Sequence, residues 1–154
     1  MDFEIREATS RNGDALLALL PRLAAFPKPD YRSDSEIYRT DERVLGRWLD
    51  GDEPNCRVVM AEGTDGALLG FALLTLRPEV LSGEPSAHIE TLVVAAEAEG
   101  RGVGSALMDA SDALARNEGA KTITLHVFET NERARKLYER KGYSTEWLRY
   151  IKFL

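Results

Sequence analysis

A glycine-rich segment in the second half of the chain limits the possible folds more than any other part of the sequence. It reads Glu99-Gly100-Arg101-Gly102-Val103-Gly104-Ser105. An apolar stretch typical of a buried strand, His88 to Val94, lies before it, and apolar residues at helical spacing follow from Val103 to Leu114. Glycine lets a ligand approach the backbone closely, and the free N–H groups at the start of a helix attract anions. The segment therefore predicts an anion site between a strand and a helix, with a ligand-free turn as the alternative.

The spacing of these glycines argues against the two common nucleotide-binding loops. A Walker A loop requires a lysine followed by serine or threonine, and no such pair follows the glycines. A dinucleotide-binding fingerprint requires Gly-x-Gly-x-x-Gly, whereas this chain has Gly-x-Gly-x-Gly, late in the sequence. A domain that binds ATP or NAD is therefore disfavoured.

Strands and helices alternate along the rest of the chain. Apolar periodicity and turn-forming residues mark the elements, for example Phe26-Pro27-Lys28-Pro29-Asp30 and Gly63-Thr64-Asp65-Gly66. We expect strands near residues 3–5, 56–61, 67–76, 88–94 and 122–128, helices near 15–23, 33–50, 103–114 and 131–141, and one or two final strands within 142–154. Such interleaving around one mixed sheet predicts an α/β or α+β class, and 154 residues suffice for one domain with one core.

Charge and composition exclude several classes of function. The net charge of −6 disfavours a broad nucleic-acid-binding face. Cys56 is the single cysteine, which excludes an internal disulfide and a cysteine-based zinc site, and the sequence shows no other metal-ligand spacing. The first residues lack a signal-peptide pattern, and the apolar stretch Ala15 to Leu20 is too short to span a bilayer. We expect a cytoplasmic protein that binds no metal, no nucleic acid and no membrane.

Two motifs together resemble the GNAT N-acetyltransferase superfamily. The first is Leu92-Val93-Val94, a five-residue gap, and Gly100-Arg101-Gly102-Val103-Gly104-Ser105-Ala106-Leu107, which is similar to motif A of that family. The second, Asn131-x-x-Ala134-x-x-x-Tyr138-x-x-x-Gly142-Tyr143, is similar to its later helix-and-strand motif. The resemblance implies a single GNAT domain over residues 1–154, with a mixed, mostly antiparallel sheet of six to seven strands flanked by about four helices.

The resemblance also implies that acetyl-CoA is the acyl donor. Its pantetheine arm would pair with the backbone of Leu92, Val93 and Val94. Its pyrophosphate would sit on the N–H groups of Gly100, Arg101, Gly102, Val103, Gly104 and Ser105. Asn131 and Tyr138 fall on one helical face and would contact the cofactor, although Asn131 is also a good N-cap. Glu99 stands where the family usually has Arg or Gln, which makes Arg101 the candidate source of positive charge.

Direct transfer of an acetyl group to a primary amine requires an acid for the leaving thiolate and a base for the amine. Tyr138 resembles the family's tyrosine near the sulfur, and a tyrosine keeps its proton at neutral pH because its pKa is about 10. Glu90 is the first candidate base and His88 the second, since residues two apart on a strand point to one face. A packed aromatic role for Tyr138, and structural or substrate-orienting roles for the other two, are the alternatives. The alternative function is a non-catalytic acyl-CoA-binding or regulatory module.

The acceptor side is specified less well. The resemblance places it between Phe26 and Trp48 and at the C-terminal strands. Candidates for an acidic, aromatic pocket, or for a solvated surface loop, are Asp30, Tyr31, Asp34, Glu36 and Tyr38. Candidates for a homodimer contact, or for a cover over the domain's own core, are Trp147, Tyr150, Ile151 and Phe153.

Overall fold

The central element of the protein is one β-sheet. A computed structural model of the chain describes residues 2–154. The strands are β1 (Phe3–Glu7), β2 (Cys56–Gly63), β3 (Leu68–Pro78), β4 (Pro85–Val94) and β5 (Thr122–Leu125). Their order in the sheet is β1-β2-β3-β4-β5. Neighbours are antiparallel except β4 and β5, which are parallel and joined through a helix. The expectation of a mixed, mostly antiparallel sheet is confirmed.

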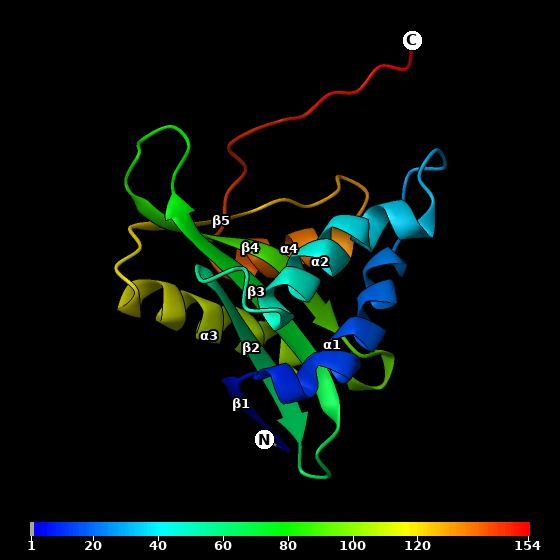
Figure 1. Cartoon of the computed structure of the whole chain (residues 1–154). Helices are drawn as coiled ribbons and strands as arrows, with labels where there is room; N and C mark the ends of the chain where they lie inside the picture. The colour runs from blue at the N-terminus through cyan, green and yellow to red at the C-terminus, as the bar shows by residue number, and fades with distance from the viewer. Residues whose placement is uncertain (1) are drawn as a thin grey trace.

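Helices cover both faces of this sheet (Figure 1). They are α1 (Gly13–Leu19), α2 (Asp34–Leu49), α3 (Val103–Asn117) and α4 (Glu132–Arg140), with the short 3-10 turns η1 (Ser10–Asn12), η2 (Leu20–Ala24) and η3 (Ala96–Ala98). On one face α1 and α2 pack in a cluster with Phe71 and Val93. On the other face α3 and α4 pack in a cluster with Ala72 and Ile89. The predicted helices are all present.

Local sequence sets where the helices begin and how closely they approach the sheet. Ser33 caps α2, because its hydroxyl accepts from the N–H of Glu36 and the Glu36 carboxylate accepts from the N–H of Ser33. Gly102 caps α3 with a φ of 82°, a left-handed conformation that favours glycine. Gly70 in β3 makes room for α3, because a Cβ there would lie 2.7 Å from the Val93 carbonyl oxygen and 3.2 Å from a Leu107 methyl carbon.

The sheet has five strands, not the six to seven that we expected. The final strands predicted within residues 142–154 are absent, and Figure 1 shows the end of the chain leaving the fold as an extended segment. Extended backbone becomes a strand only where a neighbour pairs with it, and the sheet formed by residues 2–154 ends at β5. The four apolar tail residues named above are therefore exposed and do not cover the core: Trp147, Tyr150, Ile151 and Phe153.

Strand β5 is shorter than predicted and separates from β4. It ends at Leu125, not at residue 128, and its pairing with β4 covers only Ser86 to Ile89. From Thr91 to Val94, β4 pairs with β3 alone. One edge of β4 therefore has no strand neighbour there, although the Val94 carbonyl oxygen accepts a 3.4 Å hydrogen bond from Nε of Arg22. This edge lies beside the start of α3, since a Cβ on Gly104 would lie 3.7 Å from the Val94 side chain.

Candidate active site

An irregularity in β4 brings two consecutive side chains to the same face of the sheet. The pairing with β3 shifts between Ile89 and Thr91, so Glu90 is an extra residue in the strand. One extra residue interrupts the alternation of side chains. Glu90 and Thr91 therefore both face α2, whereas Ile89 and Leu92 pack on the α3 side. His88, two residues before Glu90, shares the α2 face.

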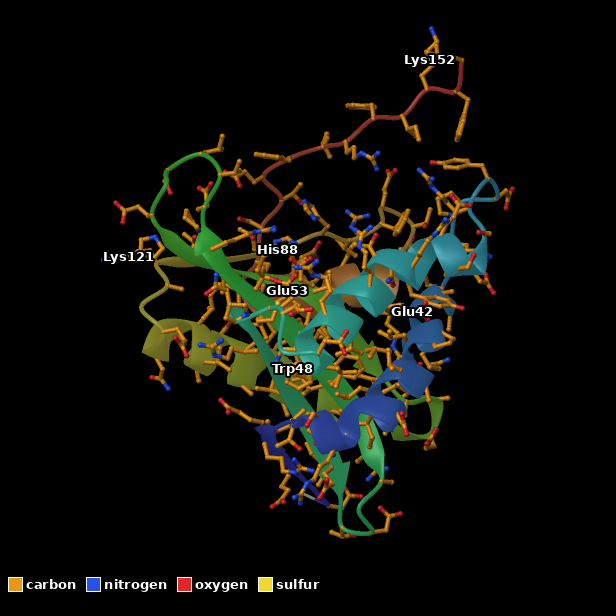
Figure 2. The ribbon with its side chains drawn as sticks, viewed as in Figure 1. Glu42, Trp48, Glu53, His88, Lys121 and Lys152 are labelled. Atoms are coloured by element: carbon orange, nitrogen blue, oxygen red, sulfur yellow. The ribbon has the colours of Figure 1, made fainter. Side chains whose placement is uncertain are left out.

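The two predicted bases have different surroundings. The Glu90 carboxylate lies 3.6 Å from Nη1 of Arg77 on β3. The His88 side chain is buried within the sheet (Figure 2), with Nδ1 2.7 Å from the hydroxyl of Thr124 and a ring-centroid distance of 4.9 Å to His126. Burial, together with the charge of Arg77 and the neighbouring His126, lowers the pKa of His88 to about 4. The imidazole is therefore neutral and only weakly basic at pH 7.

A further carboxylate on this face was missing from the sequence prediction. Asp41 of α2 is half-buried and accepts a hydrogen bond of 2.5 Å from the Thr91 hydroxyl. Burial raises the pKa of Asp41 to about 6; the Thr91 hydrogen bond opposes this shift and the charge of Glu90 adds to it. Asp41 stands four residues from both Ile37 and Leu45, within the apolar stripe of α2. The sequence signal that could have identified Asp41 is its charge, because the helical period assigns its position to the core.

The glycine-rich turn has the geometry of an anion cradle. Gly100 and Gly102 adopt positive φ values of 76° and 82°. The first N–H groups of an α-helix have no partner within the helix, and in α3 these belong to the residues from Val103 onward. Gly104 also allows α4 to pack against this helix start, because a Cβ there would lie 3.3 Å from Leu137.

Two arginines flank Glu99 at the entrance to this cradle. Nη2 of Arg22 on η2 lies 2.5 Å from one carboxylate oxygen, and Nη1 of Arg133 on α4 lies 2.7 Å from the other. These contacts, that of Arg133 above all, hold the pKa of Glu99 below its usual range. Arg101, the candidate source of positive charge, instead pairs with Asp2 at 2.6 Å. Sequence reasoning missed Arg22 and Arg133 because only the fold brings them to this turn.

Helix α4 carries the other two predicted cofactor residues. Asn131 caps the helix, since its Oδ1 accepts a 3.3 Å hydrogen bond from the N–H of Ala134. Tyr138 packs in the same apolar cluster as Leu92 and Val94 of the free β4 edge. Burial raises the pKa of Tyr138 to about 12, so its phenol keeps its proton throughout the neutral range and is able to donate it.

A hollow of about 380 Å³ lies beside α2, and Asp41 is not among the residues that line it. It is lined by Arg32, Glu36, Ile37, Arg39, Thr40, Phe128 and Arg149. Two of the acidic residues predicted for an acceptor pocket are engaged in ion pairs: Asp34 with Lys28 at 2.8 Å, and Glu36 with Arg32 at 3.2 Å. Both acidic residues lie in the first turn of α2, and Glu36 lines the hollow together with the guanidinium groups of Arg32, Arg39 and Arg149.

Within residues 2–154 no three His, Cys, Asp or Glu side chains are grouped so that they could hold a metal ion. In the same residues no helix combines the length and the apolar composition needed to cross a membrane.

The chain is similar in sequence to proteins named as acetyltransferases. Mycothiol acetyltransferase of Propionibacterium freudenreichii is 37% identical over 102 residues, which cover 66% of this chain and 31% of that protein. The uncharacterized N-acetyltransferase YhfO of Bacillus subtilis is 28% identical over 142 residues, covering 92% of this chain and 90% of that protein. This chain thus spans about a third of the mycothiol enzyme and nearly all of YhfO.

Solved structures share the fold along its whole length. A putative acetyl transferase from Pyrococcus furiosus has a TM-score of 0.80 at 24% identity, with 99% of both chains covered. A ribosomal-protein-alanine N-acetyltransferase from Brucella melitensis has a TM-score of 0.72 at 23% identity, again with 99% of both chains covered. The model of the acetyltransferase (GNAT) family matches residues 20–143, a span that contains the β4–β5 separation, the glycine-rich turn and Tyr138. The chain therefore belongs to the acetyltransferase (GNAT) family.

Proposed function

We propose that the protein is an N-acetyltransferase that moves the acetyl group of acetyl-CoA directly to a primary amine. The observation that carries the proposal is the free edge of β4 beside the anion cradle at the start of α3. A strand edge suits the amide groups of a pantetheine arm, and a cradle of N–H groups suits a pyrophosphate. The names of the relatives support acetyl transfer; one more is streptothricin acetyltransferase of Streptomyces lavendulae, 32% identical over 95 residues that cover 62% of this chain and 48% of that protein.

In this proposal each part of CoA contacts a different set of protein groups. The backbone of Leu92, Val93 and Val94 pairs with the pantetheine arm like an added strand. The N–H groups of Gly100 and of Gly102 to Ser105 hold the pyrophosphate, and that of Arg101 joins them when it leaves the Ala98 carbonyl oxygen, to which it donates at 3.4 Å. Arg22 and Arg133 approach the same phosphates when they leave Glu99. Asn131 is a further proposed cofactor contact, in addition to its capping role.

The chemistry requires three protein groups around the thioester. The amine nitrogen attacks the thioester carbon, the C–N bond forms and the C–S bond breaks. A backbone N–H at the β4 bulge polarises the carbonyl, and such a donor stabilises the transition state by about 2.7–4 kcal/mol when it is well aimed. Tyr138 donates a proton to the departing thiolate. A carboxylate on the α2 face, where Glu90 lies, removes the proton of the amine, and neutral His88 is a weaker candidate base.

Thermal unfolding with acetyl-CoA, CoA, ATP and NAD added separately tests the cofactor. A ligand at 100 times its dissociation constant stabilises a protein by about 2.7 kcal/mol, which corresponds to a shift of several degrees at this size. We expect a shift with the two CoA species alone. No shift with millimolar CoA, or an equal shift with ATP, would overturn the proposed cofactor site.

A non-catalytic acyl-CoA-binding or regulatory module is the second candidate function. It is favoured by the negative charge of Glu99 at the mouth of the cradle. Thiol release from acetyl-CoA over a panel of primary amines separates the two candidates. An enzyme releases thiol with at least one amine, whereas a binding module shows the thermal shift and no release with any of them.

A further inference from the structure

The α2 face of the β4 bulge holds two carboxylates that differ in their partners. Glu90 has the guanidinium of Arg77 at 3.6 Å. Asp41 forms no ion pair with any residue in the range 2–154, and its partner is the Thr91 hydroxyl at 2.5 Å. Partial burial without a cation strengthens a carboxylate as a base. The surroundings of Asp41 are of this kind.

The position of Asp41 suits a role in the reaction as well. Thr91 directly follows the extra residue Glu90, at the point where β4 has just lost β5 as a neighbour. Its hydroxyl donates to Oδ1 of Asp41, which leaves Oδ2 of that carboxylate without a hydrogen bond to residues 2–154. The hollow lined by Ile37 and Thr40 lies one turn back along α2. The Asp41 carboxylate therefore lies beside the part of β4 that has no β5 neighbour, with one oxygen free to accept a proton.

We propose that Asp41 is the general base that accepts the proton of the acceptor amine, held in position by Thr91, while Glu90 tunes it from the neighbouring position. This role rests on the proposed acetyl transfer. As the nitrogen lone pair forms the C–N bond, the N–H proton moves to Oδ2 of Asp41. The electron pair of the C–S bond leaves with sulfur, which takes its proton from Tyr138. Solvent then returns a proton to the phenolate and removes the one on Asp41.

The charges around Asp41 make a pH profile informative. The titratable and charged groups on this face are Glu90 and His88 of β4, Arg77 of β3, Cys56 of β2 and His126 after β5. Burial raises the pKa of Asp41 to about 6, and among these groups the charge of Glu90 adds to this shift. The acid limb of kcat/KM reports the pKa of the base in the free enzyme, so it should lie near pH 6.

The test compares Asp41→Asn, Thr91→Val and Glu90→Gln with a control, Glu42→Gln, whose side chain is exposed on the same helix (Figure 2). Acetyl-CoA-induced thermal shifts come first, and we expect the same shift in all five proteins. Thiol release with the amine that wild type uses best is then measured from about pH 5 to pH 9. We expect Asp41→Asn to lower kcat/KM by about 10²–10⁴-fold and to remove the acid limb. Glu42→Gln should match wild type.

Glu90→Gln distinguishes the two carboxylates. If Asp41 is the base, loss of the Glu90 charge lowers the pKa of Asp41, and the acid limb moves to lower pH but remains in the profile. If Glu90 is the base, Glu90→Gln removes the limb and Asp41→Asn retains it, which overturns the proposal. If Asp41 only tethers α2 to β4, Asp41→Asn and Thr91→Val lower the melting temperature alike and leave the pH profile unchanged, which also overturns it. A wild-type protein that binds acetyl-CoA but releases no thiol with any amine overturns the proposed function itself.

Discussion

Glu99 lies between Arg22 and Arg133 beside the glycine-rich turn. In the proposed complex its carboxylate competes with the phosphates of CoA for both guanidiniums. Glu99→Gln should therefore bind CoA several-fold more tightly at low salt, because the substitution frees the arginines and removes a like charge. Ionic screening should shrink this gain at high salt. Titration calorimetry at two salt concentrations measures both effects. Glu97→Gln, exposed two residues earlier, is the matched control. Weaker binding by Glu99→Gln would show that the carboxylate organises the cradle.

Tyr138 holds its proton because burial raises its pKa to about 12. If the phenol protonates the leaving thiolate, Tyr138→Phe should lower kcat by about 10²–10⁴-fold and leave the KM for acetyl-CoA unchanged. Steady-state thiol release across the neutral pH range measures this. Tyr143→Phe is the control, since the Tyr143 hydroxyl is buried without a hydrogen-bond partner in the described structure and its ring lies 6.1 Å from that of Tyr138. Unchanged turnover of Tyr138→Phe at every pH would refute the acid role.

At the scale of elements, α2 and β4 each carry one group whose titration opposes that of the other: Asp41 and His88. Asp41 has a native pKa of about 6 against a usual 3.8, so it stabilises the fold at low pH and this contribution is lost as the pH rises from about 4 to 6. His88 has a native pKa of about 4 against a usual 6.5, so its contribution is present above pH 6.5 and is lost as the pH falls toward 4. In wild type the two trends offset each other between pH 4 and 6.

Removal of either group should expose the other trend. Between pH 4 and 6, the free energy of unfolding of Asp41→Asn should rise with pH relative to wild type, and that of His88→Gln should fall. Urea unfolding at half-unit pH steps measures both slopes. Parallel curves for wild type and both variants would contradict the shifted pKa values.

Two glycines test how closely the helices and strands pack. Gly70→Ala in β3 places a Cβ 2.7 Å from the Val93 carbonyl oxygen, so we expect a destabilisation of about 1–3 kcal/mol. Gly46→Ala in α2 adds a Cβ with nothing within 4 Å, and we expect a stabilisation of about 0.5–1 kcal/mol from helix propensity. Urea unfolding measures both changes in the free energy of unfolding, and the m-values should stay unchanged. A neutral Gly70→Ala would mean that β3 and β4 move apart easily.

At the scale of the whole molecule, the C-terminal segment presents apolar side chains that the fold leaves uncovered. Trp147, Tyr150 and Phe153 are more than half exposed, at 57%, 87% and 65%. Contiguous exposed apolar residues are typical of an interaction site, and we propose that a second copy covers them. Size-exclusion chromatography with light scattering should give a dimer for the full chain and a monomer after removal of residues 145–154. Thermal stability of the shortened monomer should stay close to that of the full chain at low concentration, and a monomeric full chain would refute the contact.

Most of the elements and the glycine-rich turn before α3 could be predicted from sequence because their causes are local. The apolar period that marks α3 acts within the helix itself, and so does the capping of α2 by Ser33 and Glu36. The positive φ of Gly100 and Gly102 is likewise a property of single residues. The prediction erred where an element depends on a neighbour: the tail has the composition of a strand but finds no partner strand, and β5 ends where β4 turns away from it.

The sequence by itself therefore determined the order of strands and helices, the glycine-rich turn before α3 and the face of α4 that carries Asn131 and Tyr138. Tertiary structure alone decided which distant charges meet: Arg22 and Arg133 at Glu99, and Asp41 at Thr91. The reason is physical. Backbone conformation and amphipathic period depend on residues a few positions apart, whereas ion pairs, burial and the pKa values that follow from them depend on which surfaces the packed core brings into contact.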